Sequence, residues 1–121
     1  MKSYNKTSKE KIVKSTNPNP EKLKLVILVN ENSASASEIL AGAIQDNNVG
    51  KIVGKTTYGK GVMQEVVELK TGGALKVTIE EFKTPNGNEI NKKGIKPDIE
   101  IERGQDRDVD EQLEKAIEIL K

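Results

Sequence analysis

Residues 23–47, LKLVILVNENSASASEILAGAIQDN, predict a buried strand, a turn and a helix in direct succession. The run from Leu25 to Val29 is continuously apolar and bounded by polar residues, which is typical of a strand covered on both faces, and we place this strand at residues 23–30. From Ser35 to about Asn47 the apolar residues recur at helical spacing. One face of this helix is expected to carry Ile39, Leu40, Ala43 and Ile44.

The rest of the chain predicts an α/β fold with a β-rich second half and a C-terminal helix. Strands are expected at residues 50–54, 62–69, 74–82 and 98–102, with a hairpin turn at 71–73 and a Gly-rich loop at 55–61. Residues 1–20 are expected to be a loose N-terminal segment, apart from an edge strand at 11–15, and residues 21–121 to be the folded unit. The helix at residues 108–120 is expected to turn five side chains inward: Val109, Leu113, Ala116, Ile117 and Leu120.

The composition excludes several classes of function. The 121 residues have room for one domain and include no histidine and no cysteine, which excludes disulfides and argues against a transition-metal site. Basic and acidic residues are nearly balanced without a basic stripe, and the only aromatic residues are Tyr4, Tyr58 and Phe82, so nucleic-acid binding is not expected. The longest apolar run, Leu25 to Val29, is too short for a membrane span, and no signal peptide is visible. We expect no cofactor, no metal ion and no direct membrane insertion.

The serine cluster at residues 32–38, Asn-Ser-Ala-Ser-Ala-Ser-Glu, has two interpretations. Ser35 and Glu38 have the spacing of a capping box, and on this motif alone capping is the more frequent role. A strand-to-helix turn also projects its first side chain away from the sheet, where free backbone amides and the helix dipole can stabilise an oxyanion. Since the chain lacks histidine, a nucleophilic serine here needs a base other than imidazole, and lysine is the leading candidate.

The lone lysine at Gly59-Lys60-Gly61 is the leading candidate for that base. Such a loop is most often a solvated turn, but the glycines allow close backbone approach, and Gln64 falls on the same face of the strand that follows, where it is able to orient the amine. A lysine that acts as a general base near neutral pH must be uncharged, which requires burial in apolar surroundings. The functional interpretation therefore predicts that Lys60 is buried.

A phosphate-binding loop is the competing interpretation of this segment. Residues 54–60, GKTTYGK, match the P-loop pattern as far as its lysine and follow a strand. Gly61 stands where a serine or threonine would hold magnesium, and residues 62–67 predict a strand instead of the required helix. Nucleotide binding is therefore the weaker hypothesis.

Two segments together resemble the catalytic region of the C-terminal processing peptidases, also called tail-specific proteases. They are residues 33–43 (SASASEILAGA) with Gln45-Asp46, and residues 53–61 (VGKTTYGKG) with Gln64. The resemblance continues through residues 84–87 (TPNG), Ile90, 94–98 (GIKPD) and 112–116 (QLEKA), and covers about residues 11–120.

The resemblance implies a serine endopeptidase that processes or degrades proteins near their C-termini through a serine–lysine dyad. It places the nucleophile at Ser35, the base at Lys60, the residue that positions this base at Gln64, and one oxyanion donor at the Ala36 N–H. It also implies part of a ClpP/crotonase-like spiral, without the PDZ domain or the N-terminal part of the peptidase domain that family members carry.

The expected partners are protein or peptide substrates with accessible C-termini, and the expected location of the full-length parent is the cell envelope or another extracytoplasmic space. The alternative function is a noncatalytic peptidase core that folds, or self-associates through surfaces exposed by truncation, without cleaving peptides.

Overall fold

The computed structural model describes residues 1–7, 9–104 and 108–121, which form seven strands and two helices. The α/β class expected from the sequence is confirmed, whereas the crotonase-like spiral stays a prediction. The elements in chain order are β1 (Lys2–Asn5), β2 (Glu10–Ile12), β3 (Val26–Val29), α1 (Ala36–Asp46), β4 (Lys51–Gly54), β5 (Val62–Glu68), β6 (Ala74–Lys83), β7 (Ile99–Glu100) and α2 (Glu111–Leu120).

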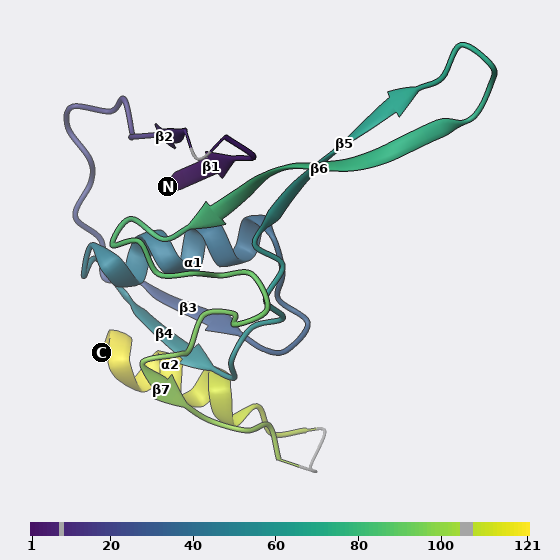
Figure 1. Cartoon of the computed structure of the whole chain (residues 1–121). Coiled ribbons are helices and arrows are strands. Elements are labelled where there is room, and N and C mark those ends of the chain that lie inside the picture. The colour runs from purple at the N-terminus through teal and green to yellow at the C-terminus, as the bar shows by residue number, and fades with distance from the viewer. Residues whose placement is uncertain (8, 105–107) are drawn as a thin grey trace.

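A parallel sheet in the order β3-β4-β7 forms the centre of the molecule. Helix α1 lies on one face of this sheet and α2 on the other (Figure 1). Ile52 and Val53 of β4 are fully buried, as expected for the middle strand of a sheet that is covered on both sides. The tight succession of β3, turn and α1 follows the sequence prediction, although β3 begins at Val26, three residues later than expected.

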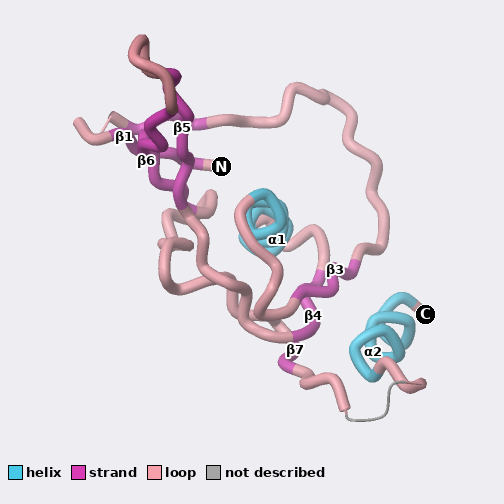
Figure 2. The backbone as a smooth tube through the Cα atoms, turned by 90° about the vertical axis from the view of Figure 1, so that its right-hand side faces the viewer, coloured by secondary structure: helices cyan, strands magenta, loops and turns pink. Residues whose placement is uncertain are grey.

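An antiparallel sheet in the order β2-β1-β6-β5 lies on the opposite side of α1, so that the helix is enclosed between two sheets (Figures 1 and 2). The hairpin of β5 and β6, which we call the arm (residues 62–83), runs outward from the body and turns at residues 70–73 as predicted. Apolar side chains on the arm remain exposed to solvent: Met63, Val66, Val67, Leu69, Leu75, Val77 and Ile79.

The hydrophobic core lies between α1 and the two sheets. Ala41 of α1 has no exposed surface, and Gly42 beside it lets Thr84 approach so closely that a Cβ on Gly42 would crowd the threonine methyl group. The helix therefore needs small residues on its inward face. The core consists of Val29, Ala41, Ile52, Phe82, Ile90 and Ile95, and no helix among the described residues is long and apolar enough to cross a membrane.

Three expectations from the sequence are wrong. Residues 2–5 are not loose: they form β1, which pairs with β6 along residues 80–83. Leu40 is 56% exposed, because the inward face of α1 carries Glu38, Ala41 and Gly42 instead.

The face of α2 is the third error. Leu113, Ile117 and Leu120 are exposed rather than inward, and the helix buries Ala116. The physical reason is that helical periodicity identifies an apolar stripe without saying which element covers it. The edge strand expected at residues 11–15 forms as β2 at Glu10–Ile12, on the outer edge of its sheet.

Candidate active site

Ser35 occupies the turn between β3 and α1 in a strained backbone conformation. Its φ is 56° and its ψ is −112°, a backbone conformation that residues other than glycine rarely adopt. Such a conformation costs of order 1–3 kcal/mol and is found mainly at functional sites. Ser33, in contrast, has a local structural role, because its Oγ accepts from the Asn30 N–H at 3.1 Å. The backbone thus distinguishes Ser35 from its neighbours in the cluster.

One buried carboxylate, that of Glu38, joins the serine turn to the lysine loop. Glu38 has no exposed surface, and its Oε2 accepts from the Ser35 N–H at 2.8 Å and from the Lys60 N–H at 2.9 Å. Its Oε1 accepts from the Thr57 hydroxyl and from the Gly59 N–H, each at 2.6 Å. The bond to Ser35 is the glutamate half of the predicted capping box. The other three bonds connect two segments more than 15 residues apart and fix their relative position.

The loop that carries Lys60 is held by further backbone contacts. The Lys92 N–H donates to the Gly59 carbonyl oxygen at 2.8 Å, and the Phe82 N–H donates to the Gly61 carbonyl oxygen at 2.7 Å. Glycine is required at both positions of this loop. Gly59 has φ +88°, and a Cβ on Gly61 would overlap the Asn91 backbone nitrogen. The Gly-rich loop is therefore a fixed support for Lys60.

A pocket of about 370 Å³ brings the predicted site residues together. It lies between the start of α1 and the base of the arm. Its lining consists of Ser35, Ala36, Ile39, Lys60, Val62, Met63, Gln64, Lys76 and Phe82. All four residues predicted from the sequence, Ser35, Ala36, Lys60 and Gln64, belong to this set.

The details of the pocket differ from the expectations in two respects. Lys60 is exposed, so the described residues do not supply the apolar enclosure predicted for a lysine base, and they contain no hydrogen bond between Ser35 Oγ and Lys60 Nζ. The Gln64 amide donates to Thr78 Oγ1 at 3.3 Å rather than orienting the lysine, because a register shift between Met63 and Gln64 alters the pairing at the base of the arm.

The amide of Ala36 is available to a ligand. Ala36 is exposed at the first position of α1, and its N–H makes no hydrogen bond with any described residue. The next amides are used within the helix start, since the Ser37 N–H donates to the Ala34 carbonyl oxygen and the Glu38 N–H to the Ser35 carbonyl oxygen. The free amide points to a place where a substrate oxygen can be bound.

The nucleotide hypothesis has no support in this geometry. A phosphate cradle needs free backbone amides in the loop, but those of Gly59 and Lys60 donate to the Glu38 carboxylate. Strand β5 follows the loop where a helix would be required. The described residues also contain no cluster of three acidic side chains able to hold a metal ion.

Sequence reasoning missed the links that Glu38 and Thr57 make within the site. Thr57 is buried, and its Oγ1 donates to Glu38 while accepting from the Ile95 N–H at 2.7 Å. One signal was available in the sequence: Ala41 and Gly42 lie three and four positions after Glu38, so a small-residue face directed at the core also directs Glu38 inward.

Comparisons with known proteins agree on one group. The family model described as peptidase family S41 matches residues 1–101. The chloroplastic C-terminal processing peptidase of Tetradesmus obliquus is 49% identical over 78 residues, and a probable CtpA-like serine protease of Staphylococcus aureus (strain COL) is 53% identical over 76 residues. The solved structure of the photosystem II D1 C-terminal processing protease is 48% identical, with a TM-score of 0.61.

These similarities cover only part of each relative. The aligned segments amount to 64%, 63% and 64% of this chain, in the same order. They amount to 17%, 15% and 20% of the relatives. The chain therefore spans less than a quarter of the length of these three relatives.

Proposed function

Because the chain belongs to peptidase family S41, we propose that it carries the nucleophile and the general base of a serine endopeptidase that processes or degrades proteins near their C-termini. Ser35 is the nucleophile, Lys60 is the base, and the Ala36 N–H is one oxyanion donor. Gln64, which the family resemblance implies positions this base, donates to Thr78 Oγ1 at the base of the arm in this structure.

The observation that carries the proposal is a pair of hydrogen bonds. The Ser35 N–H and the Lys60 N–H both donate to Glu38 Oε2, at 2.8 and 2.9 Å. A single buried acceptor holds the backbone of the proposed nucleophile and the backbone of the proposed base. Holding the nucleophile and the base at a fixed separation before the substrate binds contributes to catalysis, because their relative position need not be found during the reaction. The strained Ser35 backbone supports the same assignment.

Acylation follows from this arrangement. The uncharged Lys60 Nζ takes the hydroxyl proton of Ser35 as the Oγ attacks the carbonyl carbon of the scissile bond. The oxyanion of the tetrahedral intermediate accepts from the Ala36 N–H. When the C–N bond breaks, Lys60 returns its proton to the leaving amine, and the N-terminal part of the substrate remains as an ester on Ser35.

Deacylation reverses these roles with water as the nucleophile. Lys60 takes a proton from the water that attacks the ester carbonyl, and it returns the proton to Ser35 Oγ as the ester bond breaks. The product carboxylate is released, and the serine and the amine are restored. No co-reactant other than water is consumed.

The test is cleavage of an unstructured peptide ending in small apolar residues, followed by mass spectrometry. The chain and its Ser35→Ala, Lys60→Ala and Ser33→Ala variants are compared at equal concentration. We expect Ser35→Ala and Lys60→Ala to abolish cleavage and Ser33→Ala to retain it, because Ser33 Oγ binds the Asn30 N–H instead. Equal cleavage by all four proteins would contradict the proposal.

A noncatalytic peptidase core is the second candidate function, and the exposure of Lys60 favours it. A lysine base must be uncharged when it acts, and the described residues do not supply the apolar enclosure that favours the uncharged amine. Complete absence of cleavage by all four proteins would assign the chain to this second function. Self-association through exposed apolar surface, an extracytoplasmic location for the full-length parent and a crotonase-like spiral stay predictions that accompany the family resemblance.

A further inference from the structure

We propose that Lys76 binds a carboxylate of the substrate, so that the pocket selects peptides that carry a negative charge. The inference rests on the proposed function and names the substrate chemistry of that same site. The carboxylate belongs either to the C-terminus of the substrate or to an acidic side chain. Lys76 is then a specificity-determining residue and takes no part in bond cleavage.

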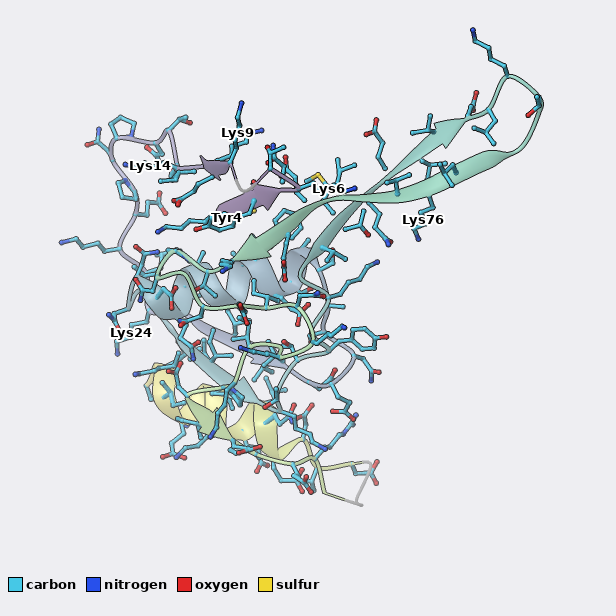
Figure 3. All side chains as sticks on the ribbon, in the orientation of Figure 1. Tyr4, Lys6, Lys9, Lys14, Lys24 and Lys76 are labelled. Atoms are coloured by element: carbon cyan, nitrogen blue, oxygen red, sulfur yellow. The ribbon has the colours of Figure 1, made fainter. Side chains whose placement is uncertain are left out.

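The position of Lys76 on the arm follows from the strand register. Lys76 lies opposite Val66, and Thr78 lies opposite Gln64. Because alternate residues of a strand share one face, Lys76 and Thr78 lie on the same side of β6. Thr78 binds the Gln64 amide at 3.3 Å, and Lys76 lines the pocket that contains Ser35. Figure 3 shows Lys76 on the arm, away from the lysines of the N-terminal segment.

The charges of the pocket favour an anion. Its lining includes two amines, those of Lys60 and Lys76, and no acidic side chain. Lys76 forms no ion pair with any described residue, although Glu68 is its diagonal neighbour across the arm. The Lys76 amine is therefore not held in an ion pair with any described residue.

The strand repeat sets the distance along the arm between Lys76 and Gln64. A strand rises about 3.4 Å per residue, so Lys76 lies about 7 Å further along the arm than Thr78 and its partner Gln64. An extended peptide has the same repeat, so a peptide beside the arm with one residue at Gln64 would place the side chain or terminus two residues further along near Lys76. A single amine in a partly open pocket is a point charge that accepts either source of carboxylate.

Binding is measured in the Ser35→Ala variant, so that the readout is independent of cleavage. The probes are acetylated tetra-alanine as the free acid, the same peptide as the amide, and the amide with one alanine replaced by glutamate. Titrations are followed by NMR at low and high salt. Lys76→Gln is the test variant, and Lys70→Gln is the control because Lys70 is exposed at the arm tip, outside the pocket, and carries the same charge.

We expect a carboxylate peptide to bind about tenfold more tightly than the neutral amide, with the preference lost in Lys76→Gln, kept in Lys70→Gln and reduced by salt. Tighter binding of the free acid would identify the C-terminal carboxylate of the substrate as the group that Lys76 binds. Tighter binding of the glutamate peptide would identify an acidic side chain instead. Equal binding of all three peptides, or a preference that survives Lys76→Gln, overturns the inference. Neither of those results affects the proposed function, which depends on cleavage alone.

Discussion

Glu38→Gln is the substitution that most directly perturbs the connection between the serine turn and the lysine loop. The Glu38 carboxylate accepts four hydrogen bonds, two at each oxygen, and is fully buried. Glutamine has nearly the same shape but replaces one of these oxygens with an NH₂ group. With the NH₂ group toward Ser35 and Lys60, both of their N–H donors lose their acceptor. With the NH₂ group toward Thr57, the Thr57 hydroxyl can turn to accept from it, and the Gly59 N–H alone loses its acceptor.

The size of the effect follows from this count. Hydrogen bonds to a charged group contribute about 1.5–3 kcal/mol each, so the loss of one or two, depending on the amide orientation, amounts to about 1.5–6 kcal/mol. Removing a buried charge offsets part of this loss. We expect the free energy of unfolding to fall by about 2 kcal/mol, a substantial fraction of the stability of a small domain. We also expect cleavage to be lost even under conditions where the variant is folded.

Urea unfolding followed by circular dichroism measures the stability change. Glu68→Gln is the matched control, because Glu68 is exposed on the arm and forms no ion pair with any described residue. This control is expected to stay within about 0.5 kcal/mol of the parent chain. If Glu38→Gln is as stable as Glu68→Gln, the carboxylate does not hold the two segments together and the reasoning is refuted.

Three further predictions concern the turn, the loop and an exposed ion pair. Ser35→Gly should raise the free energy of unfolding by about 1 kcal/mol in urea titrations, because glycine adopts φ 56° without strain, and a net loss would contradict the strained-turn assignment. Gly61→Ala should lower it by about 2 kcal/mol through overlap with the Asn91 backbone, and a neutral effect would show that the loop can move. The Lys93 ammonium at 2.6 Å holds the pKa of Glu89 below its usual value. The stabilisation is therefore present above that usual pKa and is lost as the pH falls through the lowered pKa, and NMR titration should show the Glu89 pKa rise in Lys93→Gln but not in a Lys70→Gln control.

The local elements of the fold could be predicted from the sequence. The strand, serine turn and helix α1 were predicted because their signals are short-range: an apolar run, a capping pair and a helical repeat. Strand β1 was not, because residues 2–5 are mostly polar and form a strand by pairing with β2 on one side and with residues 80–83, distant in the sequence, on the other. Such long-range pairing leaves no periodic signal in the segment itself.

The candidate site was predictable as a set of residues but not as a geometry. The family resemblance indicated Ser35, Ala36, Lys60 and Gln64, and the structure lines one pocket with all four. Lys60 is exposed among the described residues, contrary to the expected burial. The burial of a pocket-lining side chain depends on which distant segments cover it, and the sequence around Lys60 does not reveal those segments. The long-range bonds of Glu38 were missed because a glutamate three residues after a serine already has a sufficient local explanation as a cap.

Trapping of the acyl-enzyme is the measurement that tests the assignment of Ser35 most directly. The chain is mixed with an activated ester of a short peptide, quenched in acid, digested and analysed by mass spectrometry. We predict an added acyl group on the peptide that contains residues 33–38, located at Ser35, absent from Ser35→Ala and strongly reduced in Lys60→Ala. An acyl group at Ser33 or Ser37, or equal labelling of Ser35→Ala, would contradict the account.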